Sequence, residues 1–154
     1  VGQKALARTS NTPGRTQQIN FFDLGGRLMI ADLPGYGYAR APKAEVQKWT
    51  LLVESYLVGR PNLRRILILV DARHGLKDND RSVMMVLNKA AQPYQVILTK
   101  GDKIKPRPLS NLQQRIGEEA AKHPAAHPHV MVTSSQKGLG IVELRAELTA
   151  LTST

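Results

Sequence analysis

Residues 66–71 read Ile-Leu-Ile-Leu-Val-Asp, an uninterrupted aliphatic run of strand length that ends on a carboxylate. Such runs are typical of strands in a parallel sheet that is covered on both faces. Two further strands of the buried type are predicted at residues 94–99 and 129–133. We therefore expect three parallel strands, and sheets of this class bind ligands at the carboxyl ends of their strands.

Helical segments are expected between and after these runs, over residues 78–91, 108–122 and 142–151. Right-handed crossovers between parallel strands then place helices on both faces of the sheet. The prediction is an α/β fold, a three-layer sandwich with a mainly parallel, doubly wound sheet.

The amino-terminal third of the chain predicts an antiparallel edge to this sheet. Residues 17–24 and 27–32 have strand character, and Gly25-Gly26 between them is a hairpin signal. A helix is expected from Pro42 to Val58. Its apolar face consists of Val46, Trp49, Val53, Tyr56 and Leu57.

The composition indicates one basic, cysteine-free domain. Of 154 residues, 22 are Lys or Arg and 12 are Asp or Glu, a formal net charge of +10, and 42% are hydrophobic. This surplus favours polyanionic partners such as nucleic acid, with a merely solvated basic surface as the alternative. The lack of cysteine excludes disulfide scaffolds, thiolate zinc sites and cysteine nucleophiles. No apolar run approaches the ~20 residues of a membrane span, and no signal-peptide pattern opens the chain, so we expect a cytoplasmic protein without membrane contact.

Polar residues with phosphate-binding chemistry follow the strand that ends near residue 31. Asp32 could hold a metal-bound water, and the backbone N–H of Gly35 could approach a phosphate closely. Upstream, the hydroxyl of Thr16 could bind Mg²⁺ and a terminal phosphate together. The alternative for 32–35 is an ordinary turn with Pro and Gly in turn positions.

Residues 99–102, Thr-Lys-Gly-Asp, follow the second aliphatic strand. A carboxylate at Asp102 could accept two hydrogen bonds from the N–H and amino group of guanine, and the Lys100 stem could lie across the base. After the third strand, small hydroxyl residues at 133–135 leave backbone N–H groups free for the guanine carbonyl. The alternatives are a polar loop at 99–102 and a Ser-rich turn at 133–135. The order, spacing and shared location at strand ends of the four segments, 12–16, 32–35, 99–102 and 133–135, favour a nucleotide site.

These residues resemble a known family. Thr-Pro-Gly-Arg-Thr-Gln at 12–17, Asp-Leu-Pro-Gly-Tyr-Gly-Tyr-Ala at 32–39, Thr-Lys-Gly-Asp-Lys at 99–103 and Thr-Ser-Ser at 133–135 are similar to the EngB (YihA/YsxC) branch of translation-factor-type GTPases. The resemblance implies a P-loop GTPase fold over a single domain, residues 1–154. It also implies a bacterial or organellar GTPase that assists assembly of the large ribosomal subunit and is linked to cell division and septation.

The resemblance also implies site residues. Mg²⁺ would be held by Thr16 and, through water, by Asp32, with Thr16 and Gly35 as switch residues. No catalytic residue is assigned, because the position after Gly35, where many small GTPases carry a water-orienting Gln, is Tyr36. Slow hydrolysis, stimulated by a partner, is therefore expected. The residues expected to bind GTP or GDP are Gly2, Gly14, Arg15, Thr16, Gln17, Gln18, Asp32, Leu33, Pro34, Gly35, Thr99, Lys100, Gly101, Asp102, Thr133, Ser134 and Ser135.

One departure from the family is large. No G-x-x-x-x-G-K-[ST] phosphate loop occurs in the sequence, although that loop supplies most of a phosphate cradle. We therefore expect that the first strand and most of this loop are missing, with about ten residues absent between Gly2 and Gln3. The alternative is a non-hydrolysing RNA- or ribosome-binding module on a degenerate GTPase fold.

The expected partner is the large ribosomal subunit or its precursor, contacted through ribosomal RNA phosphates by the basic surface of a monomer. Arg40 and Lys43 could couple this contact to the nucleotide, or could be solvated charges at a helix start.

Overall fold

The computed structural model of the chain describes residues 20–33, 43–57 and 60–153. The chain divides into two compact units, residues 1–56 and residues 57–154.

The first unit contains the predicted hairpin. Strand β1 (Asn20–Leu24) pairs antiparallel with β2 (Leu28–Asp32) as a two-stranded sheet. Gly25 and Gly26 make the turn at φ angles of 66° and 71°, a left-handed conformation that glycine adopts without steric cost. The backbone N–H of Gly26 donates to the Asp23 carboxylate over 2.8 Å, which fixes the turn.

Helix α1 (Lys43–Leu57) is the second element of this unit, within one residue of the prediction at each end. On the predicted apolar face, Val53 is buried and the ring of Tyr56 lies 6.3 Å from that of Phe21. Leu51, outside that face, is exposed. The side chain of Val46 lies outside the described residues.

The second unit is built on a parallel sheet in the order β3-β4-β5. Strands β3 (Ile66–Asp71) and β4 (Tyr94–Thr99) have the predicted bounds, and β5 is short (Met131–Val132). The register pairs Asp71 with Thr99, so β3 and β4 end side by side. Whatever follows these strands therefore shares one edge of the sheet.

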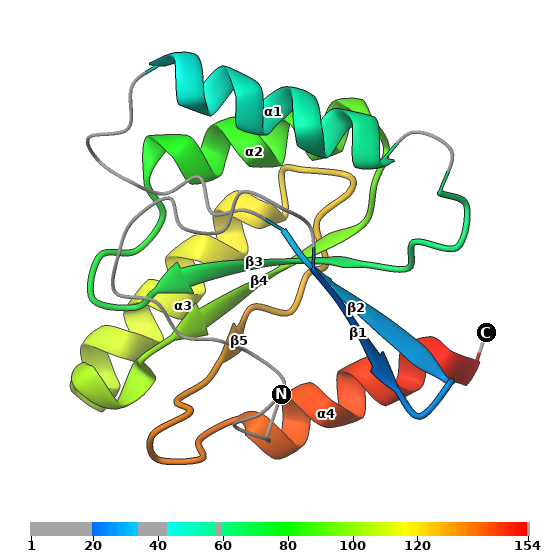
Figure 1. Cartoon of the computed structure of the whole chain (residues 1–154). Coiled ribbons are helices and arrows are strands. Elements are labelled where there is room, and N and C mark those ends of the chain that lie inside the picture. The colour runs from blue at the N-terminus through cyan, green and yellow to red at the C-terminus, as the bar shows by residue number, and fades with distance from the viewer. Residues whose placement is uncertain (1–19, 34–42, 58–59, 154) are drawn as a thin grey trace. The chain divides into compact units, whose positions relative to one another are not determined.

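Helices cover both faces of this sheet (Figure 1). Helix α2 (Asp78–Lys89) and helix α3 (Pro106–Ala120) are joined by an ion pair from Arg81 to Glu119 over 2.7 Å. Helix α4 (Ile141–Ala150) lies on the opposite face (Figure 1) and continues into a 3₁₀ turn, Leu151–Ser153. The α/β prediction, with helices on both faces of a parallel sheet, is confirmed.

The core of this unit forms around β4. Residues 94–98 are all buried, between Met84 and Leu87 of α2 and other apolar side chains. Strand β3 is covered less completely, as the 62% exposed surface of Leu69 shows. The predicted coverage of both faces therefore holds for the central strand, whereas β3 lies at an edge of the three-stranded sheet.

Several predicted boundaries are wrong by one or two residues; for example, α2 ends at Lys89 rather than at 91, and α3 ends at Ala120 rather than at 122. Helix α3 begins two residues early, because Pro106 suits the first helical position and Pro108 still falls within the first turn. The predicted strand at 129–133 is reduced to two residues, and just before it the His129 carbonyl accepts from the side-chain amide of Gln95 over 2.9 Å. Within the described ranges, none of the helices is long and apolar enough to cross a bilayer.

Candidate functional site

The carboxyl ends of β3, β4 and β5 gather the polar residues of the second unit. The backbone N–H of Ala72 donates to the Thr99 carbonyl over 2.9 Å, and that of Gly101 donates to the Thr133 carbonyl over 3.0 Å. These bonds tie three loops together just beyond the strands. Residues Thr99–Asp102 and Thr133–Ser135, separated by more than thirty positions in the sequence, therefore lie at one place.

Asp102 is held by a serine from the neighbouring loop. The Ser134 hydroxyl donates to one carboxylate oxygen of Asp102 over 2.7 Å, and the backbone N–H of Lys137 donates to that hydroxyl over 3.1 Å. The hydrogen bond from Ser134 lowers the pKa of the Asp102 carboxyl. The group is therefore ionised at neutral pH and accepts hydrogen bonds only, as recognition of two N–H donors requires.

The structure divides the roles predicted for the two serines. The backbone N–H of Ser134 is already bonded to the Leu139 carbonyl over 2.8 Å, so it is not free for a guanine carbonyl. Among the described residues, the N–H of Ser135 has no acceptor. The carbonyl contact expected of both serines is thus left to Ser135, while Ser134 positions Asp102 through its side chain.

Both threonines of the predicted site make structural bonds. The hydroxyl of Thr133 donates to the Leu98 carbonyl over 3.2 Å, and that of Thr99 donates to the Val70 carbonyl over 3.4 Å. These bonds join strand ends across the sheet. They explain why a residue with a small hydroxyl suits each position.

Close backbone approach explains two glycines of these loops. A Cβ on Gly101 would lie 2.6 Å from a methyl carbon of Val132, and one on Gly140 would collide with the Val132 carbonyl oxygen. Gly140 also has a φ of 69°, which disfavours other residues. The loop after β4 and the loop between β5 and α4 can therefore lie against Val132 of β5 only with glycine at these two positions.

Lys100 projects from a left-handed position at the end of β4. Its φ is 56°, and its ammonium lies 3.1 Å from an Asp71 carboxylate oxygen at the end of β3. The same carboxylate accepts from the Arg73 guanidinium over 2.8 Å and from the Arg73 backbone N–H over 2.9 Å. The hydrogen bonds from Arg73 hold the pKa of Asp71 far below its usual range.

Sequence reasoning missed Asp71, which it took only as the last residue of a strand. A signal was present, because a carboxylate that ends one parallel strand lies beside the residue that ends the next.

The predicted phosphate and metal residues are only partly described. Asp32 is the last residue of β2 and is exposed, with Leu33 following it. Its carboxylate makes no bond within the described ranges, and such a hard oxygen donor suits Mg²⁺ or its bound water. The other predicted positions lie outside the described residues, namely Gly2, Gly14, Arg15, Thr16, Gln17, Gln18, Pro34, Gly35, Tyr36 and Arg40, as does the side chain of Lys43.

No cluster of three or more His, Cys, Asp or Glu that could hold a metal occurs in the described part of the chain.

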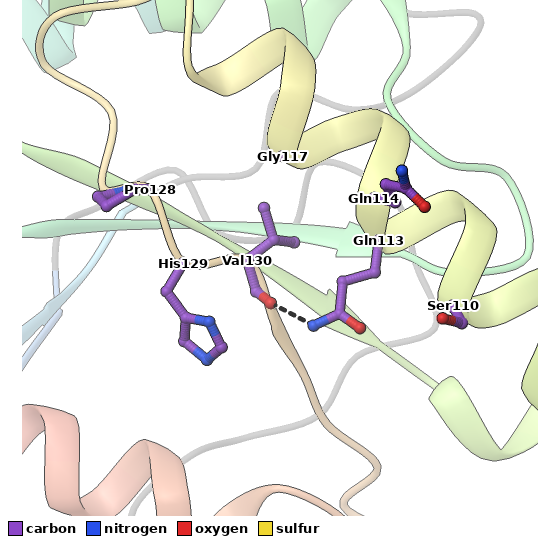
Figure 2. A pocket seen from close by; sticks show the side chains of 7 residues that line it. All are labelled: Ser110, Gln113, Gln114, Gly117, Pro128, His129 and Val130. Atoms are coloured by element: carbon purple, nitrogen blue, oxygen red, sulfur yellow. Dashed lines mark hydrogen bonds between the residues drawn. The ribbon is translucent and has the colours of Figure 1, made fainter.

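A hollow of about 260 Å³ lies elsewhere in the second unit, between α3 and the segment that leads into β5 (Figure 2). Its walls contain no Lys, Arg, Asp or Glu, and Gln113 reaches across to the Val130 carbonyl. None of the residues predicted to bind nucleotide lines it. It lacks the positive charge and the size, at least ~300 Å³, that a nucleotide pocket needs. The residues that line it are Ser110, Gln113, Gln114, Gly117, Pro128, His129 and Val130.

Comparison with known proteins agrees with this geometry. The family described as "50S ribosome-binding GTPase" matches residues 1–100. A "Probable GTP-binding protein EngB" from Rhodospirillum rubrum is 57% identical over 158 residues, covering 99% of this chain and 68% of the relative. The chain belongs to the EngB family of GTP-binding proteins.

A second EngB relative, from Granulibacter bethesdensis, is 54% identical over 152 residues, again covering 99% of this chain and 68% of the relative. The crystal structure of a "probable GTP-binding protein engB" superposes with a TM-score of 0.73 at 19% identity, over 98% of this chain and 87% of that one. The predicted EngB family and P-loop GTPase fold are therefore confirmed. For a GTP-binding family, the residues at the ends of β4 and β5 have the chemistry that guanine recognition requires.

Proposed function

We propose that this chain is a GTP-operated switch that reads guanine with Asp102 and acts in assembly of the large ribosomal subunit. The observation that carries the proposal is the Asp102 carboxylate, ionised and held by Ser134 beside Lys100 where three parallel strands end. The family description, a 50S ribosome-binding GTPase, supports the ribosomal part. A cytoplasmic setting and a link to cell division and septation belong to the same proposal.

Guanine recognition follows from the chemistry of these groups. Asp102 accepts from the ring N–H and the exocyclic amino group, a pair of donors that adenine lacks on the corresponding edge. The N–H of Ser135 donates to the guanine carbonyl, and the apolar stem of Lys100 lies across the base. A carboxylate can only accept hydrogen bonds. A base that presents another acceptor to it is therefore rejected, because neither group finds a donor.

The switch itself depends on the phosphate end of the nucleotide. Thr16 and, through water, Asp32 would hold Mg²⁺, which neutralises charge on the β- and γ-phosphates when it is bound. Contacts to the γ-phosphate order the segments around Thr16 and Gly35, and loss of that phosphate releases them. Tyr36 has no amide to orient the attacking water, so hydrolysis is slow until a partner assists.

The basic surface provides the contact with RNA. Lys105 and Arg107 at the start of α3 are exposed and make no ion pair among the described residues. Lys103, 3.8 Å from the carboxylate of Asp102, lies next to the guanine-reading loop. Such cations bind ribosomal RNA through backbone phosphates, and a monomer suffices for this mode.

Titration of fluorescent GDP into the full chain with Mg²⁺ tests the guanine part. Asp102→Asn should weaken GDP binding by roughly 100-fold or more, because two hydrogen bonds to a charged group are lost. The same variant should gain affinity for xanthine nucleotide, which presents a carbonyl where guanine has its amino group. Glu118→Gln is the matched control, since this exposed carboxylate on α3 bonds only Gln114 among the described residues.

Failure of both proteins to bind GDP would contradict the switch and favour a non-hydrolysing ribosome-binding module. Sedimentation with large ribosomal subunits tests the partner. The full chain should associate more with a non-hydrolysable GTP analogue than with GDP, because a ligand shifts an equilibrium only through differential affinity. Equal association in both states would exclude the switch.

A further inference from the structure

Asp71 lies at the end of β3 between two cations, and the proposed mechanism gives it no role. It ends β3 directly beside the end of β4, and its side chain is about one-fifth exposed. Its two oxygens face two cations, the Arg73 guanidinium and the Lys100 ammonium. The backbone carbonyl of Asp71 also closes a turn by accepting from His74 and Gly75 over 3.0 Å.

Lys100 needs a tether if it is to lie across a base. Its backbone is fixed on both sides, since Thr99 and Gly101 bond the neighbouring β3 and β5 loops. Its side chain is 55% exposed, and a free lysine stem loses substantial rotamer entropy on ordering. Asp71 is the acceptor for its ammonium in the described part of the chain. The carboxylate thus holds the stem on one side of the Asp102 loop.

We propose that Asp71 is a positioning residue for guanine binding, which orients Lys100 so that its stem covers the base. The proposal rests on the proposed function, because it assigns Asp71 to the same guanine site. Asp71 does not touch the nucleotide itself. Its contribution is to restrict Lys100 before the nucleotide arrives, which reduces the entropy lost on binding.

The sign of the effect separates this role from general electrostatics. Removal of a negative charge near an anionic ligand should strengthen binding, since repulsion is relieved. Loss of the positioning contact should weaken it. The low pKa of Asp71 means that the carboxylate is charged at any pH at which the protein would be studied.

Asp71→Asn is the test variant, because its amide oxygen can still accept from the Arg73 backbone N–H and preserve the turn, whereas its NH₂ group cannot accept from Lys100. We expect GDP affinity of the full chain to fall about fivefold, the size of a well-placed, partly exposed ion pair. Glu119→Gln is the matched control, because it removes the same charge from another exposed ion pair, with Arg81, and should leave affinity unchanged or slightly higher.

A double-mutant cycle shows whether Asp71 acts through Lys100. In a Lys100→Met background, Asp71→Asn should have no further effect on GDP affinity. Asp71→Ser, which also keeps an acceptor for the turn, should reproduce the loss if Asp71→Asn fails to fold. Thermal unfolding by circular dichroism checks that each variant is folded.

Two results would overturn the proposal. One is GDP affinity in Asp71→Asn equal to or higher than that of the unaltered chain. The other is an equal loss in the Lys100→Met background, which would give Asp71 a role independent of Lys100. With either result, the proposed function would stand if the chain still bound GDP in preference to ADP and lost that preference in Asp102→Asn. Equal binding of ADP and GDP by the unaltered chain would instead overturn the proposed function and this inference with it.

Discussion

Strand β4 begins and ends in polar clusters of opposite character. At its start, the Tyr94 side chain is fully buried, with Asn88 and His123 close by and joined by a 2.6 Å contact. At its end, Lys100 and Asp102 are charged and reach solvent. The first cluster contains no Asp, Glu, Lys or Arg and is enclosed by helices, whereas the second holds a carboxylate and an ammonium group and is fixed by loops.

The two clusters also differ in how completely their polar groups are hydrogen-bonded. The Tyr94 hydroxyl and the Asn88 side-chain oxygen are buried close together but make no well-aligned hydrogen bond in the described structure, and burial raises the pKa of Tyr94. At the other end, each ionised side chain has a partner, Asp71 for Lys100 and Ser134 for Asp102. Buried polar atoms at the start of β4 are thus imperfectly bonded, whereas Lys100 and Asp102 at the proposed guanine site each have a partner.

The largest expected effect comes from removing the buried Tyr94 ring at the start of β4. Tyr94→Ala should destabilise the protein by about 3–5 kcal/mol, because it removes a large, fully buried ring and leaves a cavity. Guanine selectivity of the remaining folded protein should not change, since Tyr94 is at the far end of the strand. Urea unfolding followed by circular dichroism measures the first quantity, and a comparison of GDP with ADP binding measures the second. A change in selectivity would show that the two ends are coupled.

Removal of one hydroxyl at each end gives a smaller, matched contrast. Ser134→Ala should weaken GDP binding about tenfold, since Asp102 loses a charge-assisted hydrogen bond and its fixed orientation. Tyr94→Phe should leave binding unchanged and stability equal or slightly higher, because the buried hydroxyl that is lost makes no well-aligned hydrogen bond. Parallel GDP titrations and thermal unfolding of the two variants provide the measurement. Equal losses of affinity would remove the distinction between the ends.

The smallest effect concerns the Arg81–Glu119 ion pair, which lies away from both clusters. The hydrogen bond from Arg81 lowers the pKa of Glu119 below its ordinary value of 4.5. The stabilisation is therefore fully present above about pH 4.5 and is lost as the pH falls through the lowered pKa. Glu119→Gln should cost at most ~1 kcal/mol at pH 7, since the pair is partly exposed. The stability difference from the unaltered chain should shrink as the pH falls below about 4.5, and a difference that does not change with pH would contradict the ion-pair explanation.

Much of the second unit could be predicted because its strands are aliphatic runs with sharp ends. The bounds of β3 and β4 follow directly from residues 66–71 and 94–99, since no polar residue other than Gln95 interrupts them before their last positions. The predicted strand at 129–133 is too long, because the side-chain amide of Gln95, 34 positions away, bonds the His129 carbonyl at the end where the ladder stops. Local sequence carries no sign of such bonds.

The site residues were predictable as types but not as partners. Motif order placed Lys100 and Asp102 at one strand end and Ser134 at another, which is where the structure has them. The bond from Ser134 to Asp102 spans 32 positions and that from Lys100 to Asp71 spans 29. Such pairs depend on the register between strands, which a single sequence does not reveal. The roles of the residues toward a nucleotide stay predictions.

The Gln113 amide affects whether another strand can add to the border of the sheet. Strand β5 lies at the border of the described sheet, and a border strand with free backbone groups is a template on which another molecule can add a strand. Gln113 occupies the Val130 carbonyl at the point where β5 starts. One side chain thereby occupies an outward-facing backbone carbonyl at this border, a position at which an added strand would otherwise form a hydrogen bond.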